Sequence, residues 1–114
     1  MSGIPGEVWR LRRRDDGRAL ADLVVTEGDF PWLYARVEAA EALGELRPLF
    51  AEEVRLLERI EDDADAWERA YEAVAAAVVL RSPAGVDVPE FLIHVDGLEA
   101  WWRWSDEPFD GGDS

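Results

Sequence analysis

The chain has 114 residues, of which 48% are hydrophobic and 11% aromatic, and this composition fits one folded domain better than a disordered chain. The 12 basic residues, all arginine, are outnumbered by 26 acidic residues, so the formal net charge is −14. That charge disfavours nucleic acids and anionic membranes as partners, because both bind through basic residues, and the lack of cysteine excludes disulfides and thiolate metal sites.

The N-terminal residues lack a basic stretch followed by an apolar run, and no apolar segment approaches the roughly 20 residues that a membrane span needs. We therefore expect a cytoplasmic protein. Neither a glycine-rich phosphate loop nor a nucleophile-elbow pattern occurs. One histidine without cysteine is too little for a zinc site, so we expect no cofactor and no metal.

The first two expected elements are strands over 8–14 and 18–26, around a turn that ends on Gly17. In the resulting register Trp9 faces Leu23 on an apolar face. The arginines of the first strand alternate onto the other face, where acids of the second strand can pair with them. The alternative is an anion contact. Its candidate residues are Arg10, Arg12 and Arg14.

Residues 30–38 alternate in a way that favours a third strand, although the alanines and glutamates that follow would also suit a helix. Proline is tolerated in the first helical turn and costs about 3 kcal/mol in the interior, so Pro48 predicts that the first main helix begins between residues 45 and 47. The second helix starts near Asp65, which has capping-box spacing to Glu68. The apolar stripes predicted to face the core are Leu46, Leu49, Phe50, Val54, Leu57 and Ile60 in the first helix, and Trp67, Ala70, Tyr71, Val74 and Val78 in the second.

Residues 78–80 predict a fourth strand, and Asp96-Gly97 joins two further β-prone runs over 88–95 and 98–104. The elements predict an α+β domain over residues 1–104, in the order β-β-β-α-α-β-β-β. An antiparallel sheet of about six strands would carry the two helices on one face. Residues 105–114, rich in aspartate, glycine and serine, are expected to form a flexible acidic tail.

The C-terminal hairpin supplies the candidate contact residues for a ligand or partner. With Asp96 and Gly97 as the central turn residues, one face carries three cross-strand pairs, which are His94 with Glu99, Leu92 with Trp101, and Glu90 with Arg103. A carboxylate beside an imidazole can orient a general base, but the plainer interpretation is a partly exposed histidine held by a neighbouring glutamate. Trp101 is either a core residue or, with Arg103, part of a contact surface, since tryptophan and arginine are typical of binding hot spots.

The run from Phe91 to Phe109, which includes His94-Val95-Asp96-Gly97 and Trp101-Trp102-Arg103-Trp104, resembles that of uncharacterised small acidic actinobacterial proteins. The resemblance extends to Asp29-Phe30-Pro31-Trp32 and Arg47-Pro48-Leu49-Phe50. The resemblance implies an actinobacterial source and a single-domain organisation, and it implies nothing about activity.

These observations predict a non-catalytic protein-interaction or binding module whose acidic surface attracts a basic protein partner. The alternative is a small-molecule-binding protein or weak hydrolase that uses His94 and Glu99 in a pocket by the C-terminal hairpin. If one sheet face stays open, exposed Leu92 and Trp101 would also favour a weak homodimer, which the net charge opposes.

Overall fold

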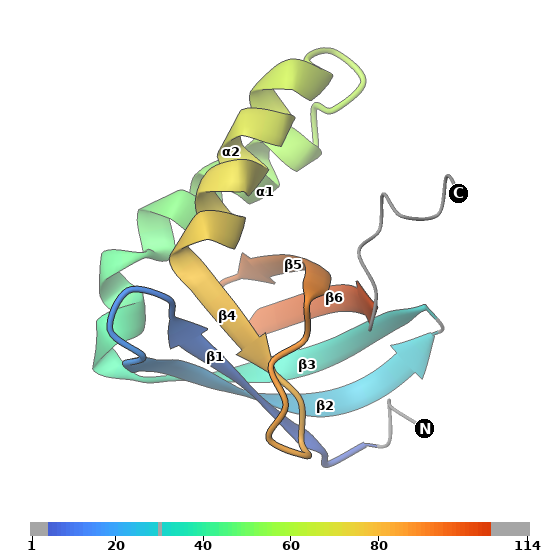
Figure 1. The fold of residues 1–114 in the computed structure, drawn as a ribbon. Helices are drawn as coiled ribbons and strands as arrows, with labels where there is room; N and C mark the ends of the chain where they lie inside the picture. Colours follow the sequence, from blue (N-terminus) through green and yellow to red (C-terminus); the bar gives the residue numbers. More distant parts are fainter. Residues whose placement is uncertain (1–4, 30, 106–114) are drawn as a thin grey trace.

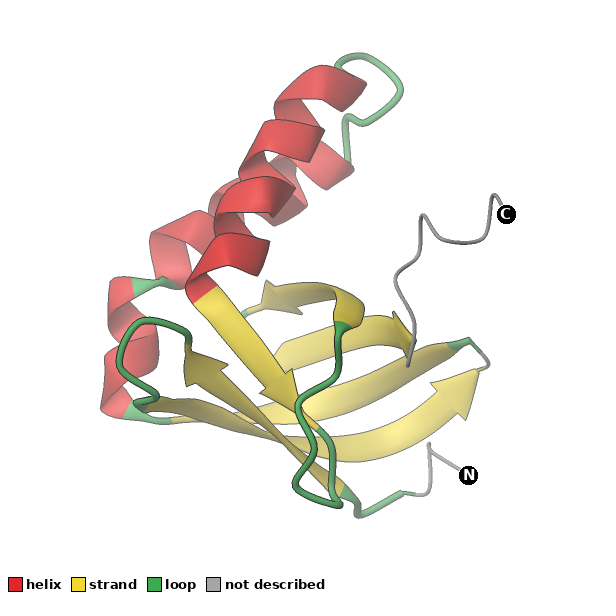
Figure 2. Cartoon of the chain, viewed as in Figure 1, coloured by secondary structure: helices red, strands yellow, loops and turns green. Residues whose placement is uncertain are grey.

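The structure is a computed structural model that describes residues 5–29 and 31–105. Within these residues six strands form one antiparallel sheet in the order β4-β1-β2-β3-β6-β5 (Figure 1). The strands are β1 (Val8–Arg13), β2 (Ala19–Asp29), β3 (Trp32–Ala39), β4 (Val78–Arg81), β5 (Glu90–Asp96) and β6 (Glu99–Ser105). Between β3 and β4 lie a 3-10 helix η1 (Glu41–Glu45) and the helices α1 (Arg47–Leu57) and α2 (Ala64–Ala77). The α+β class and the order of strands and helices are as predicted (Figure 2).

The sheet is curled, and its inner face encloses the core. Two strands separate β1 from β6, so a flat sheet would hold them roughly 14 Å apart at the usual strand spacing. The ring of Trp9 on β1 nevertheless lies 5.5 Å from that of Trp102 and 5.5 Å from that of Trp104, both on β6. Trp9 and Trp102 are fully buried, so the core forms where the two ends of the described chain meet.

The first hairpin and the third strand have the predicted arrangement. Trp9 lies opposite Leu23, and Gly17 has a φ of +72°, the left-handed conformation that its turn requires. Along β3 the side chains of Leu33, Ala35 and Val37 are buried while the residues between them are not, which is the alternation of a half-buried strand. Phe30, where the prediction began this strand, lies outside the described residues.

Helix α1 begins at Arg47 with Pro48 in its first turn, as predicted. The predicted cap of α2 is wrong: the N-cap residue is Asp63, whose carboxylate accepts the backbone N–H of Ala66 at 3.0 Å. Asp65 lies inside the first turn, where its backbone is already helical and its side chain cannot serve as the cap. Acidic residues occupy several neighbouring positions here, so spacing alone did not identify the capping residue.

The two helices form a hairpin that lies beside β5 and projects beyond the sheet (Figure 1). Helix α1 contacts β5, and α2 continues directly into β4. The helical hairpin therefore stands between β5 and β4, the two strands at the ends of the sheet order.

The predicted register of the C-terminal hairpin is wrong by two residues. Asp96 lies directly opposite Glu99, so the central turn residues are Gly97 and Leu98 rather than Asp96 and Gly97. Gly97 has a φ of +63°, and no described residue other than glycine has a positive φ, which fits a turn with glycine in its first central position. A slip of two residues keeps every side chain on its predicted face and changes only its partner. The observed pairs are His94 with Trp101, Leu92 with Arg103, and Glu90 with Ser105.

Candidate functional site

The six predicted contact residues of the C-terminal hairpin all lie on one surface, here called the outer face: the side of β3, β6 and β5 that points away from the core. Glu99, Trp101 and Arg103 alternate onto it from β6, and their cross-strand partners follow from β5. Strand β3 adds Tyr34, which lies opposite Trp101, and Trp32, two residues earlier.

His94 is the exception on this face because it is almost fully buried, at 1% exposure. Its Nδ1 atom is hydrogen-bonded to the carboxylate of Glu53 on α1, at 2.8 Å and 3.0 Å from the two oxygens. The indole N–H of Trp67 on α2 donates to the same carboxylate at 2.7 Å. The predicted partner, Glu99, is instead exposed at the end of the hairpin. The pairing of His94 with Glu99 is therefore wrong, because α1 covers His94 from outside the sheet.

Aromatic rings from three elements enclose the imidazole. Trp32 on β3 is stacked against it at a centroid distance of 6.0 Å, and Trp101 on β6 is tilted at 5.4 Å. Tyr71 on α2 lies 6.3 Å away. Because His94 is buried beneath these rings, a substrate on the outer face does not reach its ring. The hydrogen-bonded pair of Glu53 and His94 therefore connects the helical hairpin to the sheet.

Sequence reasoning missed Glu53, although a signal for it exists. Glu53 follows Phe50 by three residues and precedes Leu57 by four, so it lies within the apolar stripe of α1. A carboxylate at such a position must be buried with a partner or must distort the helix packing. In the structure its partners are His94 and the indole N–H of Trp67.

Tyr71 closes the outer edge of β5. Its hydroxyl donates to the backbone oxygen of Phe91 at 2.8 Å and accepts the backbone N–H of Ile93 at 3.0 Å. These are the groups that a further strand would otherwise bind. Burial raises the pKa of Tyr71 well above its usual range, so the hydroxyl keeps the proton that it donates.

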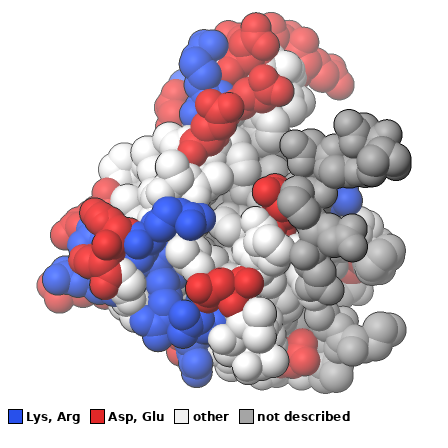
Figure 3. All heavy atoms as spheres, in the orientation of Figure 1, with Lys and Arg blue, Asp and Glu red and all other residues white. Residues whose placement is uncertain are grey.

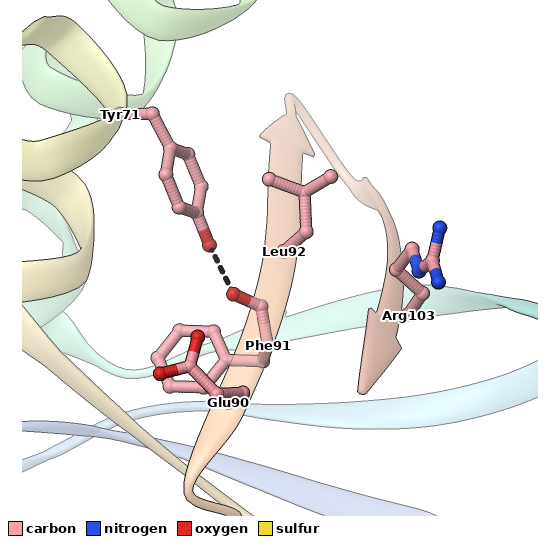
Figure 4. Close-up of a pocket in the computed structure, with 5 residues that line it drawn as sticks. All are labelled: Tyr71, Glu90, Phe91, Leu92 and Arg103. Atoms are coloured by element: carbon pink, nitrogen blue, oxygen red, sulfur yellow. Dashed lines mark hydrogen bonds between the residues drawn. The ribbon is translucent and has the colours of Figure 1, made fainter. Parts of the chain in front are cut away.

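The other predicted contact residues line two depressions on either side of Trp101. Glu90, Leu92 and Arg103 surround one of about 470 Å³, together with Tyr71 and Phe91 (Figure 4). A smaller one, of about 220 Å³, has as its lining residues Thr26, Glu27, Tyr34, Ala35, Glu99, Ala100 and Trp101. His94 lines neither of these two depressions, so His94 and Glu99 do not meet in either of them.

The arginines proposed as an anion contact are engaged within the chain. Arg10 lies 3.6 Å from Asp22, and Arg12 donates to the backbone oxygen of Gly17 at 2.8 Å. Arg14 donates to the carbonyls of Ala75 and Val78, at the end of α2. Figure 3 shows arginines grouped on the lower part of this view, while acidic side chains dominate the far end of the helical hairpin.

Among residues 5–29 and 31–105, no three acidic or histidine side chains gather as a metal ion would require. Within the same ranges no helix is long and apolar enough to cross a membrane. No protein-family model, no curated protein and no solved structure matches the chain. The resemblance to actinobacterial proteins therefore stays a prediction.

Proposed function

We propose that the chain is a cytoplasmic, non-catalytic protein-interaction module that binds a basic segment of a partner protein on its outer face. The observation that carries the proposal is the group of aromatic side chains on this face. Trp32 and Trp101 are partly exposed and Tyr34 is 36% exposed, although all three lie on the side of the sheet away from the core. Tryptophan and tyrosine are the residues that most often supply binding energy at protein interfaces.

The charges around these aromatic residues favour a basic occupant. The carboxylates on the outer face and its borders are Glu27, Glu38, Glu90, Asp96 and Glu99. The cations among the described residues of this surface and its borders include Arg36, Arg47 and Arg103, and each has a partner within the chain. Arg36 is bound to Glu38 at 2.9 Å, and Arg47 donates to the backbone oxygen of Gly97 at 2.8 Å. Lysine or arginine side chains of a partner can lie over the aromatic rings and pair with the carboxylates. The net charge of −14 would also attract such a partner over a longer range.

The weak-hydrolase alternative has less support. It required His94 and Glu99 to act together, and His94 is held by Glu53 beneath Trp32 and Trp101. A general base must come within hydrogen-bond reach of a substrate proton, and the burial of His94 argues against this.

The test is a titration with a synthetic peptide of alternating arginine and alanine, followed through the backbone amide signals of the protein. We expect saturable shifts on β3 and β6, weakened by added salt because the contact is partly electrostatic. Tyr34→Ala should weaken binding about tenfold or more, as removal of a hot-spot residue does. The control is Val86→Ala, which truncates an exposed side chain in the loop between β4 and β5. Equal binding of a peptide with glutamate in place of arginine would refute the proposal, as would an unchanged affinity in Tyr34→Ala.

A further inference from the structure

We infer that the depression between α2 and the β5–β6 hairpin is a receptor for a single lysine or arginine side chain, with Glu90 as the anchoring carboxylate. The inference rests on the proposed function, because the side chain would belong to the basic partner segment. It assigns a second point of contact, beside the aromatic residues of the outer face. At about 470 Å³ the depression lies within the range of roughly 300–1,000 Å³ that is usual for ligand pockets.

Glu90 is the residue that makes the depression selective for a cationic side chain. Its side chain is partly buried beside Phe91 and Leu92, and among the described residues no group donates a hydrogen bond to its carboxylate or forms an ion pair with it. Other carboxylates of the chain, such as Glu52 and Asp87, have an arginine partner. A carboxylate beside apolar side chains is poorly hydrated, so it gains more from an incoming cation than an exposed one does.

The walls fit the aliphatic stem of a lysine or arginine. Leu92 projects from β5 between Glu90 and Arg103, and Tyr71 reaches down from α2 onto the same strand (Figure 4). The hydroxyl of Tyr71 both donates a hydrogen bond to the backbone of β5 and accepts one from it. A ligand in the depression would therefore contact the ring of Tyr71 and not its hydroxyl. Long cationic side chains bury their methylene groups on such apolar surfaces while the charged end pairs elsewhere.

Arg103 sets the orientation and the number of cations. It lies on β6 directly opposite Leu92, on the other side of that residue from Tyr71 (Figure 4). Its guanidinium has a partner of its own within the chain and carries the same charge as the ligand, so the charged end of the ligand side chain lies at Glu90. The single carboxylate of Glu90 therefore provides for one cationic side chain, and it repels an anionic one.

The experiment uses the full chain and three small probes: N-acetyl-argininamide, N-acetyl-lysinamide and the neutral analogue N-acetyl-citrullinamide. Amide signals of Glu90, Leu92 and Arg103 are followed by NMR at low ionic strength. We expect saturable shifts with the two cationic probes and none with the citrulline analogue. Glu90→Gln should weaken binding about tenfold, since it removes one charge-assisted contact. The matched control is Glu61→Gln, which removes the same charge from an exposed position in the loop between α1 and α2 and should change the affinity less than about twofold.

Three results would overturn the inference: no saturable shifts with either cationic probe, equal binding of the citrulline analogue, or equal affinity in Glu90→Gln and the unsubstituted chain. The outcomes also separate this inference from the proposed function. If the arginine–alanine peptide binds normally to Glu90→Gln but poorly to Tyr34→Ala, the outer face binds basic segments and the Glu90 receptor is refuted. If argininamide binding requires Glu90 while Tyr34→Ala leaves the affinity for the arginine–alanine peptide unchanged, the Glu90 receptor is supported and the aromatic contact is refuted.

Discussion

At the scale of single residues, Glu53 connects three elements through one carboxylate. It binds His94 of β5 and accepts the indole N–H of Trp67 on α2, while its own backbone belongs to α1. All of this occurs at 0% exposure, where a polar group without a partner is costly.

Glu53→Ala leaves His94 buried without its partner and Trp67 without its acceptor. We expect the free energy of unfolding, measured by urea denaturation, to fall by about 3 kcal/mol. Glu53→Gln should lose less, because the amide oxygen can still accept from Trp67. The neighbouring variant Glu52→Ala is the control, since it removes only an exposed pair with Arg55. If Glu53→Ala costs no more than Glu52→Ala, the buried pair does not hold the helical hairpin to the sheet.

Tyr71→Phe removes the hydroxyl that binds Phe91 and Ile93 on the edge of β5. The two backbone groups then lose their partner, and we expect a loss of about 1–3 kcal/mol in unfolding free energy. The local readout is amide hydrogen exchange, which should accelerate at Ile93 before it does so in the centre of the sheet. Tyr34→Phe serves as the control, because Tyr34 lies on the exposed side of β3. Unchanged exchange at Ile93 would contradict this role of the hydroxyl.

The Asp16 carboxylate has an unusually low pKa. Its hydrogen bond with Arg13, followed by the backbone N–H of Arg18, lowers the pKa to about 2 from the usual 3.8. Because the folded state has the lower pKa, this contact stabilises the fold above about pH 4, and the contribution is lost as the pH falls toward 2. A carbon-detected NMR titration of the side chain checks the value. A midpoint near the ordinary 3.8 would mean that the contact with Arg13 is not maintained in solution.

The candidate site could be predicted from the sequence only in part, because some of its contacts are local and others join residues that are far apart in the chain. Alternation placed Glu90, Leu92, Trp101 and Arg103 on one face, because alternation is a local property of a strand. The partner of His94 was missed because Glu53 lies 41 residues away and belongs to a helix. Cross-strand rules find partners within a sheet, and they do not detect a helix packed against its edge.

At the scale of elements, hydrophobic period and proline position were sufficient to predict the strands and helices, while several of their ends were misplaced. The second strand, for example, ends at Asp29 rather than at residue 26. The C-terminal turn moved by one position because Gly97, and not Asp96, takes the positive φ. The cap of α2 moved because several consecutive acids could occupy the capping position. Both errors concern choices between residues one or two positions apart, which periodicity cannot distinguish.

The N-cap of α2 contributes to the stability of the fold. Asp63→Ala should lower the unfolding free energy by about 1 kcal/mol, because it leaves the N–H of Ala66 without an acceptor. Asp65→Ala should lower it by less, since that side chain only complements the helix dipole. Thermal unfolding of the two variants, followed by circular dichroism, compares them directly. A larger effect of Asp65→Ala would reassign the cap to the position first expected.

At the scale of the whole molecule, the strand order could not be predicted from the sequence. Strand β4 pairs with β1, and β6 pairs with β3, across long stretches of chain. No local pattern specifies such pairings, because they depend on how the curled sheet buries Trp9 and Trp102 together. The expected number of strands and their antiparallel arrangement followed from the elements alone.

The net charge governs self-association. Two copies at −14 repel each other, yet the outer face exposes aromatic side chains that a second copy could cover. We expect a weak homodimer that forms only as added salt screens the repulsion, detectable by light scattering at low and high salt. Trp101→Ala should abolish it. A monomer at high protein concentration in both conditions, or a dimer that ignores Trp101→Ala, would exclude this contact.

The meeting of Trp9 with Trp102 and Trp104 has an optical consequence. Indole rings at centroid distances of 5.5 Å, held at interplanar angles of 62° and 56°, couple their electronic transitions and produce a paired positive and negative band in circular dichroism. One ring comes from the first strand and the others from the last, so the paired band arises only after the two ends of the chain have come together. The three indole rings lie where strands from the two ends of the sequence meet, so the band distinguishes a completed core from a chain that has formed only its local hairpins.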